Sequence, residues 1–183
     1  SLDVCLNTGD TEEYRVVKTE TRLEAQSRDA TVKVMASSDG QIAVGTGTVY
    51  RYEGHNIVVT AAHVIGEPPY LVAVLTQYEY VMAEVVYFDS EMDLAVLVIP
   101  DVPGLSSMPF RPAPERSIKI GTDVLYSGFP NDGELFTIRG YITALHPSGE
   151  VYLHSYAWPG SSGSSVFDSR GRLIGVLVAI EVG

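Results

Sequence analysis

Short runs of alternating apolar and polar residues, rich in Val, Ile, Tyr and Thr, repeat along most of the chain from about residue 31. A period of two residues is typical of strands with one buried face, and Gly, Pro, Asn and Asp separate the runs as turn formers do. The pattern predicts two series of strands. The first comprises 31–37, 42–52, 56–61, 71–76, 79–88 and 93–99, and the second comprises 119–127, 135–145, 150–156, 164–167 and 172–180.

A proline-rich stretch, IPDVPGLSSMPFRPAPE, separates the two series. Because proline cannot donate to a central ladder, we expect a connector over 101–118. Residues 1–29 are polar and charged, and we expect an N-terminal arm there with a short helix over 16–28. The chain is therefore expected to be an all-β protein whose two halves, 30–100 and 119–183, form two barrels or two sandwiches.

The charge balance disfavours two classes of partner. The chain has 12 Lys and Arg against 23 Asp and Glu, for a formal net charge of −11. Nucleic-acid binding and docking on anionic membranes both depend on clustered basic residues, so we expect neither partner. The longest apolar runs, such as RLIGVLVAI, are far shorter than the roughly 20 residues of a membrane-spanning helix, and no signal peptide is visible.

Cys5 is the single cysteine of the chain, so we expect no intramolecular disulfide and a structurally idle thiol. A protein without disulfides is compatible with the cytoplasm, the periplasm or a viral context, and the localisation stays open.

Three residues attract attention, although each has a plain structural explanation when taken alone. His63 follows NIVVTAA, which we interpret as a buried strand that ends in two alanines. These small residues leave room for a partner beside the imidazole. A structural histidine whose ring bonds to the backbone explains the pattern equally well. Asp93 precedes the apolar run LAVLVI and alone reads as a turn aspartate. Ser162 lies between Gly160 and Gly163 in PGSSGSSVF and alone reads as a turn serine.

Taken together, these residues suggest nucleophilic catalysis. A serine hydroxyl becomes a nucleophile when an imidazole takes its proton, and the imidazole needs a carboxylate to orient it and stabilise its cation. His63, Asp93 and Ser162 supply the three groups in that order. Gly160 would let the backbone bend so that its N–H and that of Ser162 converge on a developing oxyanion.

Other serine chemistries fit the sequence less well. The G-x-S-x-G elbow of α/β-hydrolases needs a glycine two residues after the nucleophile, with Asp and His following. Here residue 164 is serine, and no histidine follows Ser162. The subtilisin order of Asp, His, Ser belongs to a helix-rich fold, and no lysine lies three residues after a serine. The order His, Asp, Ser on two β-rich halves remains.

The segments TAAHV (60–64), DLAVL (93–97) and PGSSGSSVF (159–167) resemble the three signature segments of chymotrypsin-fold, trypsin-like serine proteases. The resemblance is to the disulfide-free branch, which includes HtrA-like and viral enzymes. GTGTVY (45–50) resembles its glycine-rich strand before the catalytic histidine, and GRLIGVLVAI (171–180) its substrate-binding strand. The resemblance implies two packed, antiparallel β-barrels of the six-stranded type, with the active site in the cleft between them.

The same resemblance implies a serine endopeptidase that acts on protein or peptide substrates through an acyl-enzyme. Ser162 would be the nucleophile, His63 the general base and acid, and Asp93 the orienting carboxylate. The backbone N–H groups of Gly160 and Ser162 would form the oxyanion hole. Substrate would pair as an added strand, and the residues expected to bind it or line its S1 pocket are Tyr156, Ala157, Val178, Ala179 and Ile180. No carboxylate or histidine is expected in that pocket, which favours a small or medium apolar P1 residue.

The sequence departs from the family pattern at three positions near the expected site. Ser161 stands where trypsin-like zymogens have an aspartate, so that activation switch is expected to be absent. Val64 stands in place of a disulfide cysteine, in agreement with the cysteine count. Val178 stands where a hydroxyl usually supports the catalytic aspartate, so we expect backbone N–H groups near Ala62 and His63 to solvate Asp93 instead.

Two alternatives stay open. One is a catalytically inert binding module with a protease fold. The other is a viral-type protease that cleaves itself and is then inhibited by its own terminus; because the sequence ends at Gly183, soon after the expected binding strand, this alternative predicts the terminus in the cleft. No cofactor is implied, and His146 and His154 lack the Cys or acidic neighbours of a metal site. The oligomeric state is left open.

Overall fold

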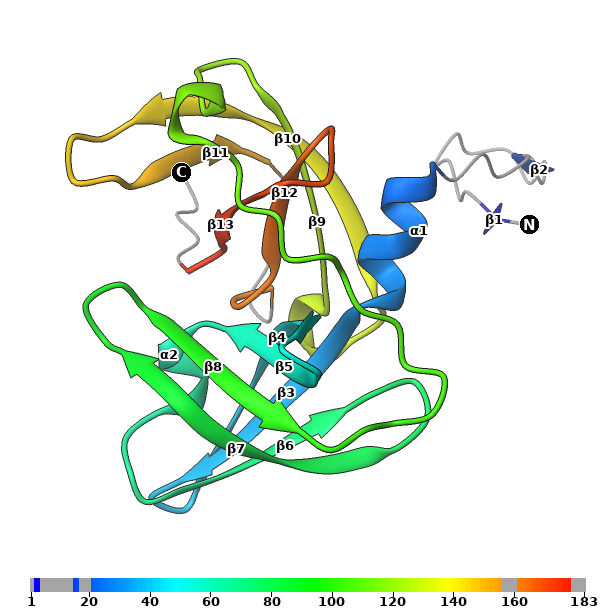
Figure 1. Ribbon diagram of the computed structural model, residues 1–183, viewed down its shortest axis with the longest axis vertical. Helices are drawn as coiled ribbons and strands as arrows, with labels where there is room; N and C mark the ends of the chain where they lie inside the picture. The colour runs from blue at the N-terminus through cyan, green and yellow to red at the C-terminus, as the bar shows by residue number, and fades with distance from the viewer. Residues whose placement is uncertain (1, 4–14, 17–20, 156–160, 179–183) are drawn as a thin grey trace, which may run out of the picture.

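The computed structural model describes residues 2–3, 15–16, 21–155 and 161–178. Its strands form two stacked lobes, joined by a long connector that runs along one side (Figure 1). The first lobe is a closed barrel with the strand order β3-β4-β5-β8-β7-β6, and the second is a five-stranded sheet with the order β11-β10-β9-β12-β13. The described strands of both lobes pair in antiparallel fashion.

The strands of the first barrel are β3 (Thr31–Ser38), β4 (Gln41–Tyr52), β5 (His55–Thr60), β6 (Tyr70–Leu75), β7 (Tyr80–Asp89) and β8 (Leu94–Ile99). Those of the second lobe are β9 (Asp123–Gly128), β10 (Phe136–Leu145), β11 (Val151–His154), β12 (Ser165–Asp168) and β13 (Leu173–Val176). The remaining elements are β1 (Leu2–Asp3), β2 (Arg15–Val16), helices α1 (Arg22–Asp29) and α2 (Ala62–Ile65), and the 3₁₀ turns η1 (Glu115–Ser117) and η2 (Pro130–Asp132).

The predicted fold class, an all-β protein of two barrels, is confirmed, with one correction. The second lobe has five strands among the described residues and forms a half-barrel, not the expected six-stranded barrel. The strand expected over 172–180 ends at Val176. After it, the Leu177 N–H still donates to the Ser164 carbonyl at 2.8 Å, while the Leu177 carbonyl accepts from Gly163 at 2.8 Å. The chain there bonds to the loop before β12 instead of continuing the regular ladder.

Valine and isoleucine at alternate strand positions fill the closed barrel, and a second small cluster lies inside the half-barrel. A third cluster lies between the lobes and joins residues that are far apart in sequence: Ala30, Tyr50, Val59, Met108, Leu125 and Phe167. Since burial of apolar area is the main stabilising term in folding, this cluster holds the two lobes together.

Strand β4 is buried on both faces over Gly45–Tyr50, because one face closes the first barrel and the other meets the second lobe. The glycines of this stretch permit close packing inside the barrel: a Cβ on Gly47 would lie 2.5 Å from Val58 Cγ1. On the other face, Thr46, Thr48 and Tyr50 alternate toward the second lobe and bond to it. We call these three residues the hydroxyl row.

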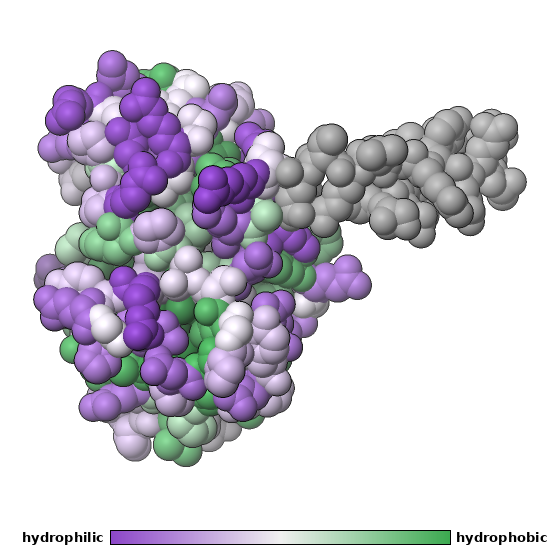
Figure 2. All heavy atoms as spheres, turned by 45° about the vertical axis from the view of Figure 1, so that its right-hand side comes forward, coloured by the Kyte–Doolittle hydropathy of each residue, from purple (hydrophilic) through white to green (hydrophobic). Residues whose placement is uncertain are grey.

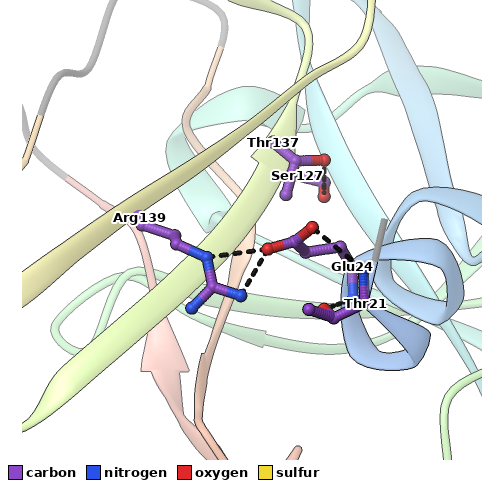
Figure 3. Close-up of polar contacts among 5 residues, drawn as sticks. All are labelled: Thr21, Glu24, Ser127, Thr137 and Arg139. Atoms are coloured by element: carbon purple, nitrogen blue, oxygen red, sulfur yellow. Dashed lines mark hydrogen bonds and ion pairs between the residues drawn. The ribbon is translucent and has the colours of Figure 1, made fainter. Parts of the chain in front are cut away.

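Helix α1 is shorter than the expected 16–28, and it lies against the second lobe. Its sequence TRLE is a capping box, in which Glu24 N–H bonds the Thr21 hydroxyl while Thr21 N–H bonds the Glu24 carboxylate. Figure 3 shows that the same carboxylate faces Arg139 of β10, whose Nε donates at 2.7 Å and whose Nη2 donates to the same oxygen. The second half of the polar arm is thus a docked helix.

Polar contacts of two further residues, Ser27 and Arg28, fix this helix. The Ser27 hydroxyl lies 2.8 Å from that of Ser127, which lies 2.8 Å from Thr137 Oγ1; the Ser127–Thr137 contact is drawn in Figure 3. Arg28 donates to the same Thr137 hydroxyl at 3.0 Å and to the Leu135 carbonyl at 3.3 Å.

The surface of the two lobes differs in the view of Figure 2. Hydrophilic side chains dominate the upper lobe, whereas hydrophobic side chains reach the surface in places on the lower one. The exposed apolar residues of β6 and β7 in that lower lobe are Leu71, Tyr80, Met82, Val86, Tyr87 and Phe88. Among the described residues, no helix is long and apolar enough to cross a membrane.

Candidate active site

His63 lies in a helical turn just after a strand, and this turn was not predicted from the sequence. Strand β5 stops at Thr60, and α2 begins at Ala62. Gly66 ends this short helix with φ = 80°, a left-handed conformation that glycine adopts without strain. The two alanines before His63 are buried, at 0% and 2% exposure, whereas the His63 side chain is open to solvent. Small side chains therefore let the chain turn sharply at the barrel rim.

Asp93 occupies the turn between β7 and β8, on the same rim. Asp89 shapes this turn, because its Oδ1 accepts the N–H groups of Glu91 at 3.0 Å and Met92 at 3.1 Å. Asp93 itself has φ = 55°, an uncommon left-handed conformation in which Asp is enriched. Backbone strain of this kind persists where surrounding structure imposes it and is concentrated at functional sites.

The structure brings Asp93 and His63 into direct contact. Asp93 Oδ2 lies 2.6 Å from His63 Nδ1, and Asp93 Oδ1 accepts the His63 backbone N–H at 2.7 Å. An ionised carboxylate can only accept hydrogen bonds, so Nδ1 carries the hydrogen and Nε2 is left as an acceptor. The backbone contact confirms the expected solvation of Asp93 by an N–H group of the His63 segment, which is otherwise an unpaired donor of the first helical turn.

Ser162 occupies the second position of a tight turn. The Ser164 N–H donates to the Ser161 carbonyl at 3.0 Å, and Gly163 has φ = +95°. A turn with positive φ at its third residue is of type II, and glycine is preferred there. The prediction of a tight loop between core elements is confirmed by this geometry, which places Ser162 at the outside of the bend.

Burial separates the four serines of PGSSGSSVF. Ser161, Ser164 and Ser165 are 0–1% exposed, whereas Ser162 is partly exposed. The Ser165 hydroxyl accepts from Tyr50, while those of Ser161 and Ser164 have no partner among the described residues. Ser162 is therefore the serine of this loop whose side chain reaches solvent.

A residue of β4 connects the Ser162 turn to the rim that carries His63. Thr46 N–H donates to the Ser162 carbonyl at 2.9 Å. A Cβ on the preceding Gly45 would lie 2.6 Å from Val64 Cγ2 and 3.0 Å from the Ser162 carbonyl oxygen, so the segment after His63 and the Ser162 turn flank the same glycine. No hydrogen bond joins the Ser162 hydroxyl to the His63 ring within the described part of the chain; in enzymes without bound substrate, hydrogen bonds between reacting groups are often long.

The hydroxyl row supports the Ser162 loop and was missed in the sequence. Thr46 Oγ1 accepts the Phe129 N–H at 3.1 Å, Thr48 Oγ1 accepts the Ser165 N–H at 3.3 Å, and the Tyr50 hydroxyl donates to Ser165 Oγ at 2.8 Å. Burial raises the pKa of Tyr50 well above its usual range, so it stays a neutral donor. The alternation T-x-T-x-Y marks one strand face, but it does not say what that face contacts.

Several expected site residues lie outside the described residues: Gly160 of the oxyanion hole, the pocket residues Tyr156, Ala157, Ala179 and Ile180, and also Cys5 and Gly183. Val178 is described and is 37% exposed. It follows Leu177, whose backbone bonds both Gly163 and Ser164, so the expected substrate-binding segment directly adjoins the Ser162 turn.

The other histidines are distributed over the surface of the two lobes. His146 Nδ1 bonds Ser148 within a turn, and the ring of His154 packs on Tyr141 with 5.2 Å between centroids. His55 starts β5, at the end opposite to His63. Across the residues that the structure describes, no three His, Cys, Asp or Glu side chains are grouped so as to hold a metal ion.

Comparison with known proteins agrees with this geometry. Residues 45–176 match the trypsin-like peptidase domain family. The chain is 32% identical over 142 residues to serine endoprotease DegS of Salmonella typhimurium, a match that covers 73% of this chain and 38% of that protein. It is 32% identical over 147 residues to the chloroplastic protease Do-like 1 of Arabidopsis thaliana, covering 74% and 33%.

The chain also superimposes on the crystal structure of the serine endoprotease from Yersinia pestis with a TM-score of 0.72, at 24% identity, over 88% of this chain and 58% of that one. This likeness shows the fold. The chain spans only 38% and 33% of the length of the two curated relatives. Since the family match runs through most of the chain and includes all three site segments, the protein belongs to the trypsin-like peptidase domain family and has the chymotrypsin fold of its HtrA-like members.

Proposed function

We propose that this chain is a serine endopeptidase in which Ser162 is the nucleophile, His63 the general base and acid, and Asp93 the residue that orients His63. The observation that carries the proposal is the pair of hydrogen bonds between Asp93 and His63, at 2.6 and 2.7 Å. They hold the imidazole in the tautomer whose Nε2 can accept a proton, which is the role of the carboxylate in a Ser-His-Asp triad.

The exposure of the residues agrees with these roles. The His63 side chain is 47% exposed and that of Asp93 is 25% exposed, so a substrate can reach the ring while the carboxylate stays behind it. Ser162 is the accessible serine of its loop. A general base must be open to the reacting group, whereas the orienting group benefits from a lower local dielectric.

In the proposed reaction, Nε2 of His63 takes the Ser162 proton while Oγ attacks the carbonyl carbon of the scissile bond. The developing oxyanion would accept hydrogen bonds from the backbone N–H groups of Ser162 and Gly160. His63 then gives its proton to the leaving amine, and an acyl-enzyme remains on Ser162. Water, deprotonated by His63, hydrolyses that ester and restores the free hydroxyl.

We propose protein or peptide substrates that align as an extra strand along the segment at Val178, as the fold allows. The support for P1 selectivity comes from sequence alone. Among the expected pocket residues, Tyr156, Ala157, Ala179 and Ile180 carry no charge. A pocket without a carboxylate gives no partner to Lys or Arg, so we propose cleavage after small or medium apolar residues.

The test is the intact mass of the protein after treatment with a fluorophosphonate, which reacts readily with an activated serine hydroxyl. We expect one adduct on the wild type and none on Ser162→Ala. Ser169→Ala is the matched control, because Ser169 is an exposed serine of the next turn, and it should be labelled like the wild type. A peptide library then measures the P1 preference.

The other outcomes point to the alternatives. A folded wild type without an adduct would contradict the proposal and favour the binding module. An adduct together with very slow peptide hydrolysis would favour a self-inhibited protease. That alternative concerns the terminus at Gly183, which lies outside the described residues. A variant truncated after Ile180, which keeps the expected pocket residues, would test it by regaining activity.

A further inference from the structure

Thr60 is the last residue of β5, three residues before His63, and its side chain is fully buried. Its hydroxyl donates a hydrogen bond of 2.7 Å to the main-chain carbonyl of Thr46. We infer that Thr60 is a positioning residue: its hydroxyl fixes the placement of the Ser162 turn relative to the helix that carries His63. The inference rests on the proposed function and adds a residue to it.

The strand register explains why a side chain is needed at this place. The β4–β5 ladder ends with Thr48 opposite Val59, so Thr46 lies opposite Ala61, where the chain has already left the sheet for α2. The backbone groups of Thr46 on that side therefore extend beyond the end of the β5 ladder. The Ser162 carbonyl bonds to the N–H at 2.9 Å, and the Thr60 hydroxyl bonds to the C=O.

One residue of β4 thus holds both parts of the proposed site, and the packing around it is tight. A methyl group on Gly163 would overlap the Thr46 carbonyl oxygen and also Thr60 Oγ1, so the Ser162 turn lies directly on this hydrogen bond. Gly45, which precedes Thr46 in β4, lies close to Val64 and to the Ser162 carbonyl, as described above. A shift of the Thr46 carbonyl would therefore displace both the Ser162 turn and α2.

Loss of the Thr60 hydroxyl removes this hydrogen bond from the Thr46 carbonyl, and with it a constraint on where that carbonyl lies. Valine has nearly the same shape as threonine, so Thr60→Val removes the hydrogen bond while filling the space. A displacement of about 1 Å between reacting groups can cost about 100-fold in rate. The effect should fall on the chemical step, since Thr60 is buried behind the turn and does not face a substrate.

The experiment compares the rate of fluorophosphonate labelling and the kcat and KM of peptide hydrolysis for the wild type, Thr60→Val and Thr60→Ser. We expect Thr60→Val to label about 10-fold to 100-fold more slowly, with kcat reduced and KM nearly unchanged. Thr60→Ser keeps the donor and should recover most of the rate. Thermal unfolding of each variant establishes that it is folded at the assay temperature.

Thr76→Val is the matched control. Thr76 is also buried and its hydroxyl also donates to a main-chain carbonyl, that of Glu79 at 3.0 Å. It lies in the β6–β7 turn, where it also accepts the N–H groups of Tyr78 and Glu79, and β6 is separated from β4 by β3. It should lose stability without a matching loss of labelling rate. If Thr60→Val does not fold, Thr60→Cys, with a weaker donor of similar size, should fall between the wild-type rate and a 100-fold loss.

The results separate this inference from the proposed function. An unlabelled wild type would refute the proposed function itself. A labelled wild type with Thr60→Val at the same rate, or with Thr60→Val and Thr76→Val slowed equally, would overturn the inference and leave the function standing. A loss that appears in KM alone would also overturn it.

Discussion

Asp93 accepts two hydrogen bonds from His63, one from the ring at Nδ1 and one from the backbone N–H, at 2.6 and 2.7 Å. The two contacts come from different parts of the same residue, so they fix both the position of α2 at the barrel rim and the orientation of the imidazole. A single side chain in a left-handed turn thereby determines which nitrogen of His63 is available for chemistry.

Asp93→Asn tests that relationship. The substitution preserves shape but replaces one acceptor oxygen with a donor, which favours the wrong tautomer of the histidine; in Ser-His-Asp proteases this costs about 10⁴ in kcat. We expect a loss of that order in peptide hydrolysis. Asp101→Asn is the control, because Asp101 is an exposed carboxylate paired with Arg51. A loss below about tenfold would remove Asp93 from the proposed mechanism.

Gly163→Ala should damage the Ser162 turn in two ways. The added methyl group overlaps Thr46 and Thr60, and φ = +95° is strained for any residue other than glycine. We expect a loss of about 3 kcal/mol in the free energy of unfolding, measured in denaturant, and loss of fluorophosphonate labelling.

Gly149→Ala separates the two causes of that effect. Gly149 has φ = +96° but open space around it, so only the backbone strain applies. It should cost about 1 kcal/mol and leave labelling intact. Equal effects of the two substitutions would mean that the contact with Thr46 and Thr60 is unimportant.

The docking of α1 should depend on acid pH through Glu24. The hydrogen bond from Arg139 lowers the pKa of the Glu24 carboxyl below its usual range. A lowered pKa in the folded state gives stability that is present above the unfolded value and is lost as pH falls through the folded value. Glu24→Gln keeps an oxygen for the Thr21 cap and removes the ion pair, so we expect it to cost about 0.2–1 kcal/mol at pH 7, since the Arg139 side chain is 56% exposed.

Urea unfolding at pH 7 and at pH 3 measures this contribution. The difference between wild type and Glu24→Gln should shrink at the lower pH, where the wild-type carboxyl begins to take up its proton. A difference that stays constant between the two pH values would show that the charge of Glu24 contributes nothing to the docking of the helix.

Alkaline pH should weaken the contact between the two lobes through Tyr50. Burial raises the pKa of Tyr50, and also that of Tyr126, above the usual tyrosine value. The stability is complete below the unfolded pKa of about 10. Above it, the large shift of Tyr50 costs about 1.4 kcal/mol per pH unit, because only the unfolded state loses the proton there.

Tyr50→Phe should therefore lose less stability than the wild type between pH 8 and pH 11 in urea unfolding. At pH 8 the variant itself should be about 1 kcal/mol less stable, because Ser165 loses a buried donor. Tyr52→Phe, at a half-exposed position of the same strand, should behave like the wild type. A steep alkaline loss in Tyr50→Phe equal to that of the wild type would assign the effect to other groups.

Much of the fold could be predicted from the sequence because its signals are local. The alternation of apolar and polar residues located every strand of the two lobes to within a few residues, since the period of two directly reflects the pleat. The proline-rich connector and the turn glycines were visible for the same reason. The short helix at His63 was not, because its four residues, Ala62–Ile65, are too few to show a helical period.

The packing of α1 against the second lobe was not predicted, for a different reason. Its capping box can be found in TRLE, but Arg139, which faces Glu24, lies 115 residues away in the sequence. Neither segment carries a signal that identifies the other as its partner. The last strand, expected over 172–180, likewise ends early, at Val176, because Leu177 bonds to Gly163 and Ser164 in the loop before β12.

The sequence by itself determined the chemical groups of the candidate site, their order along the chain and the β-rich halves that carry them, because these depend on residue identity and local period. Only the tertiary structure decided that Ser162 is the accessible serine, that Asp93 bonds His63 twice, and that Thr46 and Thr60 join the two parts of the site. Those relations depend on long-range register and packing. Serine and threonine occur in most strands and turns, and their partners are chosen only when distant segments meet.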